Sequence, residues 1–222
     1  MTEFQAIEFE KAVQTQYLSK TSFDYVSKIA WQSTQIASHN EITAKLSSLS
    51  LLLYAKNVHY GYVKNDKEFS DITTFFESKI KEIDLDNAGF SESFWYYKSH
   101  LLYSILVQDL LSAYKFANKW VELFFMSPDM IELHPVFFIR GHQHLFEILY
   151  LLKYMSKFKM ALQRFEATLA LNPDKLVYQD GEPNKIYVDN VLVTDFTEID
   201  KKVEELNLQE PMRILREERN RR

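Results

Sequence analysis

Apolar residues recur at intervals of three and four along most of the chain, and this spacing limits the possible folds more than any other feature of the sequence. Phe94, Tyr97, Leu101 and Ile105 form one such series, and residues at these intervals share one face of an α-helix. The chain also has only 4 Gly and 5 Pro among its 222 residues, where average usage would give about 15 and 11. So few turn residues favour long helices with short connections, and the sequence therefore predicts an all-α fold.

The clearest apolar series group into three pairs of helices. We expect the first helices of these pairs at about Glu41–Lys64, Glu92–Gln108 and Pro135–Met155. The turns within the pairs fall near Asp66, Asp109 and Ser156, which are 43 and 47 positions apart. Two-helix units that repeat at this length are typical of α-solenoids, in which each pair buries its apolar surface on its neighbours. The sequence thus predicts a helical-repeat domain over residues 1–173.

Residues 174–222 have a different character and form a separate, irregular segment in this interpretation. The β-branched residues of Ile186–Val193 surround Asp189-Asn190 and predict a short β-hairpin. A helix is expected from about Phe196 to Leu206.

The end of the third pair resembles the second helix of a tetratricopeptide repeat, through Phe158, Ala161, Leu162, Phe165, Leu169, Leu171, Asn172 and Pro173. In that motif, a small residue such as Ala161 lets the paired helix approach closely. The stretch from Lys119 to Phe165 is also similar to a group of bacterial tetratricopeptide-like proteins of unassigned function. This resemblance, over residues 40–173, implies a right-handed superhelix of antiparallel helix pairs, a scaffold or partner-binding role, and no catalytic residue.

Composition and charge narrow the classes of function. The absence of cysteine excludes a disulfide framework and thiol catalysis. A net charge of −5 gives no general attraction to nucleic acid or to anionic lipid. The sequence shows neither a signal peptide nor an apolar stretch long enough to span a bilayer. We therefore expect a cytoplasmic protein that binds neither nucleic acid nor membrane and requires no cofactor.

The densest group of possible metal ligands lies between Glu132 and Glu147, where His134, His142 and His144 occur. Zinc needs three or four ligands that converge on one point. Since His142 and His144 are two positions apart, a helix would direct them to different sides. We predict no metal site here, and a metal-dependent enzyme that uses this region is the most remote alternative.

The sequence predicts a non-catalytic scaffold or adaptor that binds a protein or peptide on its helical surface, with a peptide-sensing regulatory module as the alternative. Tyr, Trp and Arg dominate binding hot spots, and the first helix of each solenoid pair generally lines the concave side. The residues predicted to bind the partner are therefore the polar or aromatic ones on these helices, namely Trp95, Tyr96, Lys98, Arg140 and His144. Nothing in the sequence sets the oligomeric state.

Overall fold

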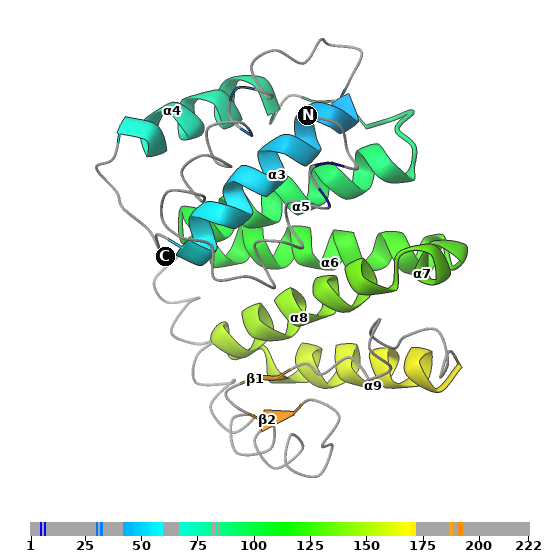
Figure 1. Ribbon diagram of the computed structural model, residues 1–222. Coiled ribbons are helices and arrows are strands. Elements are labelled where there is room, and N and C mark those ends of the chain that lie inside the picture. Colours follow the sequence, from blue (N-terminus) through cyan, green and yellow to red (C-terminus); the bar gives the residue numbers. More distant parts are fainter. Residues whose placement is uncertain are drawn as a thin grey trace. The chain divides into compact units, whose positions relative to one another are not determined.

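The computed structural model describes residues 42–59, 67–80, 83, 85–171, 187–188 and 191–192, together with Gln5, Ile7, Ala30 and Gln32. Helices dominate this part of the chain (Figure 1), as the apolar spacing predicted. They are α3 (Ile42–His59), α4 (Lys67–Phe75), the π-helix η1 (Phe76–Ile80), α5 (Phe90–Leu106), α6 (Leu110–Met126), α7 (Asp129–Leu133), α8 (Pro135–Leu151) and α9 (Met155–Leu171). Among these described helices, none combines the length and hydropathy that a membrane crossing needs.

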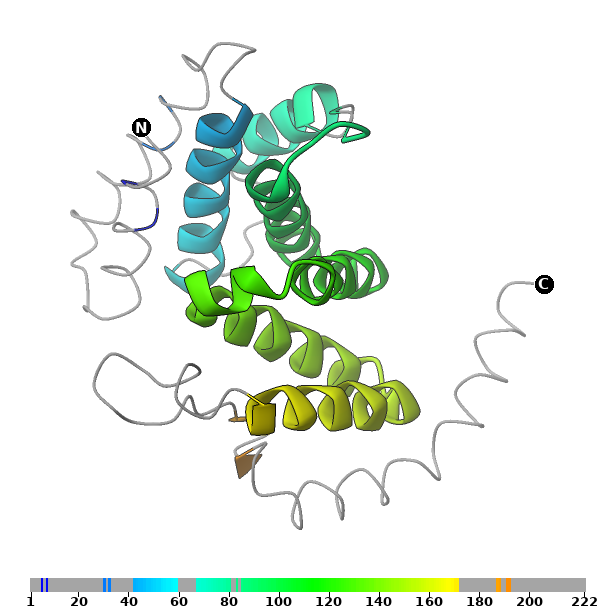
Figure 2. The same cartoon turned by 90° about the vertical axis from the view of Figure 1, so that its right-hand side faces the viewer.

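The chain divides into two compact units, Met1–Phe116 and Ala117–Arg222, with the division inside α6. In the first unit, α3 and α5 lie side by side (Figure 2). Leu46, Leu49 and Leu53 of α3 are buried. The Ser99 hydroxyl of α5 also donates a hydrogen bond to the Leu46 carbonyl of α3, at 3.1 Å. A small residue at position 99 thus allows α5 to reach the backbone of α3.

An aromatic cluster connects the π-helix η1 with α5. The ring of Phe76 stacks on Tyr103 at a centroid distance of 3.9 Å and meets His100 edge-on at 4.7 Å. The Tyr103 hydroxyl lies 3.3 Å from the Glu77 carboxylate. The residues of η1, Phe76–Ile80, follow α4 directly and have π rather than α geometry.

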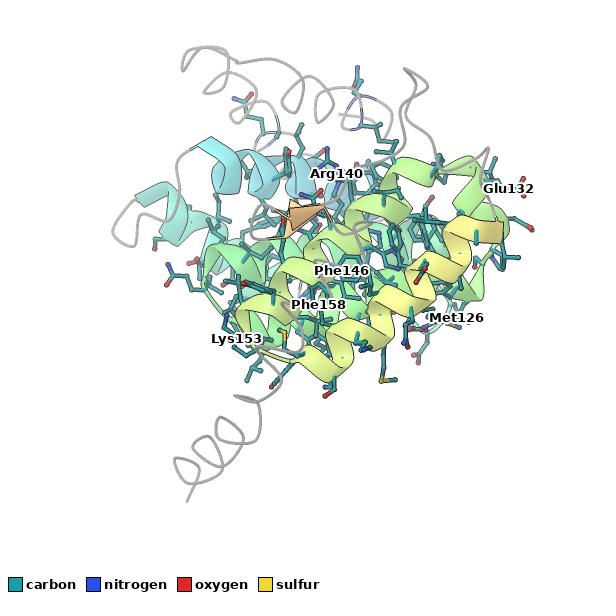
Figure 3. The ribbon with its side chains drawn as sticks, turned by 90° about the horizontal axis from the view of Figure 1, so that it is seen from below. Met126, Glu132, Arg140, Phe146, Lys153 and Phe158 are labelled. Atoms are coloured by element: carbon teal, nitrogen blue, oxygen red, sulfur yellow. The ribbon has the colours of Figure 1, made fainter. Side chains whose placement is uncertain are left out.

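In the second unit, α8 and α9 pack against each other through phenylalanine side chains. Phe146 of α8 and Phe158 of α9 lie between the two helices (Figure 3), with ring centroids 5.2 Å apart. Phe165 meets Phe146 edge-on at a centroid distance of 5.7 Å and stacks with Phe138 at 6.0 Å. All four rings are buried. Large, stiff side chains therefore supply the core between these helices.

The pairs α5–α6 and α8–α9 have the same construction. Each of the four helices has 17 residues, and residues 107–109 and 152–154 join them. The middle residue of each turn has a left-handed backbone, with φ of 60° at Gln108 and 59° at Lys153. Corresponding helices of these two pairs thus begin 45 positions apart, for example at Phe90 and Pro135.

Hydrogen bonds repeat at the same offset. The Asp109 N–H donates to the Ser104 carbonyl at 2.8 Å, and the Tyr154 N–H donates to the Leu149 carbonyl at 2.9 Å. This bond, from the residue after a left-handed one back into the last helical turn, defines a Schellman motif. Buried positions of the second helices also recur, with Ala113, Ala117 and Trp120 of α6 followed by Phe158, Leu162 and Phe165 of α9.

Glycine at position 108 should stabilise the chain, because a left-handed backbone costs a residue with a Cβ atom about 1–2 kcal/mol. Part of this gain is lost to the greater freedom of glycine in the unfolded chain, so we expect Gln108→Gly to raise the free energy of unfolding by about 0.5–1 kcal/mol. Lys153→Gly should gain less, since it also removes an ammonium group 4.4 Å from the Tyr150 ring centroid. Urea unfolding of both variants measures the difference, and destabilisation by Gln108→Gly would contradict this account.

The helix boundaries correct one sequence prediction and add two features that were not predicted. The turn expected near Ser156 lies at residues 152–154, and Ser156 already belongs to α9. The N-cap of α5 is Gly89, whose N–H donates to the Glu92 carboxylate. A five-residue helix, α7, occupies the connection Asp129–Leu133, for which no helix was predicted.

Two short strands lie within the region that was predicted to be a hairpin. β1 (Tyr187–Val188) and β2 (Val191–Leu192) pair antiparallel, and β1 packs against α8. The residues that join and flank them lie outside the described part of the chain, as does the predicted domain boundary at Pro173. The complete hairpin, this boundary and the helix at Phe196–Leu206 therefore stay predictions.

Candidate partner-binding surface

The five residues predicted to bind a partner are divided between the two units. Trp95, Tyr96 and Lys98 belong to α5 in the first unit, whereas Arg140 and His144 belong to α8 in the second. Each group is therefore considered by itself.

Trp95 and Lys98 lie in the interior of the protein, which corrects the expectation that both are surface residues. Their exposed fractions are 0% and 2%. The Lys98 Nζ lies 4.8 Å from the Trp95 ring centroid, a distance at which an ammonium group interacts with the ring face. Four consecutive aromatics on a helix cannot all face the core, and here Phe94 and Trp95 are buried while Tyr96 and Tyr97 are half-buried. We remove Trp95 and Lys98 from the candidate surface.

Tyr96 lies at the edge of an aromatic group in the first unit. Its ring centroid is 4.2 Å from His100 and 6.4 Å from Phe116 of α6. Burial raises the pKa of the Tyr96 hydroxyl, and the neighbouring Tyr97 raises it further. The hydroxyl therefore stays protonated at neutral pH and can both donate and accept a hydrogen bond.

Arg140 and His144 belong to a connected set of polar side chains on α8, which we call the α8 polar row and define as Arg140, Gln143, His144 and Glu147. Arg140 Nη1 donates to Gln143 Oε1 at 2.7 Å, and Gln143 Nε2 donates to Glu147 Oε1 at 3.1 Å. His144 Nδ1 lies 3.9 Å from Glu147 Oε2. All four side chains are half-buried. Hydrogen bonds thus hold a guanidinium, an amide and a carboxylate in a fixed order along the helix.

The electrostatics of the row centre on Glu147. Burial raises the pKa of its carboxyl group, while the hydrogen bond from Gln143 and the charge of Arg140 lower it. The net direction is upward, so Glu147 takes up a proton at a higher pH than a free glutamate. Binding of a cation or a hydrogen-bond donor to Glu147 would therefore weaken as the pH falls toward the pKa of this group.

The residues at the corresponding positions of α5 have a different environment. An offset of 45 positions relates Arg140, Gln143, His144 and Glu147 of α8 to Trp95, Lys98, Ser99 and Leu102 of α5. These α5 residues are buried, and Ser99 bonds directly to α3. On α5, this face packs against α3. The corresponding face of α8 instead carries side chains that are polar and only half-buried.

Of the four residues in the α8 polar row, only Arg140 and His144 were predicted from the sequence. Gln143 and Glu147 were missed as binding residues, although Arg140, Gln143 and Glu147 are separated by three and four positions in a helix that is otherwise largely apolar. That interruption of the apolar spacing was the available signal, because residues at these intervals share a helix face.

The histidines considered as metal ligands lie in different environments. His134 is exposed between α7 and α8, His142 is buried, and the His144 side chain is 20% exposed. His142 Nδ1 lies 2.9 Å from the Phe138 carbonyl, and its ring centroid is 4.4 Å from that of Phe138. Across the described residues, no three His, Asp or Glu side chains are arranged to hold a metal ion.

Comparisons with known protein families, with curated proteins and with solved structures find no match to this chain. Its function must therefore be inferred from its own residues.

Proposed function

We propose that this protein is a non-catalytic, tetratricopeptide-like helical-repeat scaffold that binds a segment of a protein partner through the α8 polar row. The observation that carries the proposal is the position of the row. It occupies the face that on α5 accepts a helix, and it presents polar groups there instead of the buried Trp95 and Leu102. Arg140 and Glu147 of α8 thus occupy the positions that Trp95 and Leu102 occupy on the packed face of α5.

The chemistry of the row suits a peptide. Arg140 supplies hydrogen-bond donors, Glu147 supplies acceptors, and Gln143 supplies both. Because these side chains already contact one another, less rotamer entropy is lost when a partner binds. Tyr96, in the first unit, supplies a second candidate contact with an aromatic face and a protonated hydroxyl. The same surface would also serve a peptide-sensing regulatory module.

Selection from a displayed random-peptide library against the purified full chain tests the proposal. Peptides enriched on the wild-type chain should bind the double variant Gln143→Ala/Glu147→Ala about tenfold or more weakly, because hydrogen bonds to a charged group contribute about 1.5–3 kcal/mol. Gln163→Ala is the matched control, since Gln163 is an exposed glutamine on α9. It should leave the affinity unchanged.

Two results would contradict the proposal. One is a folded Gln143→Ala/Glu147→Ala variant that binds every selected peptide as tightly as the wild-type chain. The other is equal weakening by the double variant and by Gln163→Ala, which would show that binding is not specific to the α8 polar row. Circular dichroism of each variant separates loss of binding from loss of folding.

A further inference from the structure

α9 contacts α6 through a specific pair of side-chain interactions. The guanidinium carbon of Arg164, on α9, lies 3.6 Å from the centroid of the Phe125 ring on α6. The same guanidinium forms an ion pair with Glu122. Positions 122 and 125 of α6 thus form the place where the second helix of one pair contacts the second helix of the next.

The 45-position offset locates the corresponding place on α9. Glu122 corresponds to Ala167 and Phe125 to Ala170, and both alanines are exposed. Met160 and Leu171, which share a helix face with Ala167, are 69% and 82% exposed. The α9 outer stripe, defined as Met160, Ala167, Ala170 and Leu171, is therefore a set of exposed apolar side chains, with Gln163 and Arg164 between Met160 and Ala167 on the same face, where the repeat would place a further second helix.

The chain itself contains a segment with the required pattern. Phe196, Ile199, Val203 and Leu206 are separated by three, four and three positions, so they would form one apolar stripe on a helix. Most of the residues between them are charged. The offset from α9, which begins at Met155, places a further second helix at about residue 200, within this segment.

This segment follows β2 closely in the sequence. β1 packs against α8, and β2, which pairs with β1, ends at Leu192 in the same unit. Three residues separate Leu192 from Phe196, and an extended chain covers about 3.3–3.6 Å per residue. We propose that residues 196–206 form a helix whose apolar stripe docks on the α9 outer stripe and completes the repeat in place of a further helix pair.

Cysteine labelling of the full chain tests this docking, because the chain has no cysteine of its own. A maleimide should react with Ala167→Cys about fivefold or more slowly than with Glu166→Cys, since a docked helix must open before the thiol is reached. Position 166 is also exposed on α9 but lies outside the stripe. Adding Val203→Asp to Ala167→Cys should restore fast labelling and leave Glu166→Cys unaffected.

Hydrogen exchange supplies a second measurement that does not depend on a cysteine. Amides of residues 196–206 should be protected in the wild-type chain and lose that protection in Leu171→Asp, whose substitution lies on α9 outside the segment. Equal labelling of Ala167→Cys and Glu166→Cys, with no effect of Val203→Asp, would overturn the proposal. Protection of Ala167→Cys that increases with protein concentration, together with a dimeric mass, would overturn it as well, because a second copy would then cover the stripe.

Discussion

Acidification from pH 7 to pH 4.5 should destabilise the second unit by about 2–3 kcal/mol through His142 alone. The imidazole is 1% exposed, and burial lowers its pKa to about 4, with a smaller contribution from the charge of Arg164. The unfolded chain has the ordinary pKa of 6.5, so between about pH 6.5 and pH 4 it binds a proton that the folded state does not. The stabilisation is therefore complete above about pH 6.5 and is lost as the pH falls toward 4.

The packing around His142 explains why a proton is excluded. The ring centroid lies 4.7 Å from Phe165, 5.8 Å from Phe125 and 5.9 Å from Phe146. The polar contact that the structure gives the ring is Nδ1 with the Phe138 carbonyl at 2.9 Å. A charge surrounded by phenylalanine rings is poorly solvated, and the nearby Arg164 cation opposes it further.

The variant His142→Phe provides the comparison, because it keeps an aromatic side chain but cannot be protonated. Urea unfolding of both proteins between pH 7 and pH 4.5, with hydrogen exchange of α8 and α9 peptides to localise the effect, measures the difference in pH dependence. Glu147 has a raised pKa and contributes with the opposite sign, but it is present in both proteins and cancels. Stability profiles that run parallel over this pH range would refute the assignment to His142.

The sequence predicted the helices well because their residues repeat a simple periodicity. Leu106, Met126 and Leu171 end helices close to where the apolar series stop, and Pro128 and Pro173 follow two of these ends. The left-handed residues that join the pairs were not predictable, since Gln108 and Lys153 have no preference for that backbone. For this reason the turn at residues 152–154 was placed too late in the sequence.

Exposure of individual side chains was predicted less well than helix position. Lysine is usually found on protein surfaces, yet Lys98 is buried beside Trp95. The apolar stem of lysine can pack while its ammonium group interacts with an aromatic face. Whether a helix face is covered depends on which helix packs against it, as α3 does on α5, and one helix sequence does not contain that information.

The close helix approach was expected at Ala161, through the resemblance to the tetratricopeptide motif. Ala161 is only half-buried, and the structure shows a close approach at Gly141 of α8. A Cβ atom at position 141 would lie 3.1 Å from Nε1, 3.2 Å from Cδ1 and 3.3 Å from Cε2 of Trp120 on α6. Trp120 is 1% exposed, so its indole has little space to move. Glycine at 141 thus permits the contact between α8 and Trp120.

Gly141→Leu should lower the free energy of unfolding of the second unit by about 1–3 kcal/mol, because added side-chain atoms must displace a buried indole ring. Gly141→Ala should have a smaller effect, since the gain in helix propensity of about 1 kcal/mol offsets the short contacts. Thermal and urea unfolding followed by circular dichroism measure both variants. A Gly141→Leu protein as stable as the wild type would show that the indole moves aside without cost.

A double-mutant cycle with Trp120→Leu shows whether Trp120 is the residue that position 141 must avoid. Trp120→Leu alone leaves a cavity and should itself cost several kcal/mol, since large-to-small changes in a core cost about 3–5 kcal/mol. The side chain introduced by Gly141→Leu can occupy part of that cavity, so the two effects should compensate with a coupling energy of about 1–3 kcal/mol. Additive effects would instead assign the cost of Gly141→Leu to contacts other than Trp120, and the close approach of the two helices would then not depend on the indole.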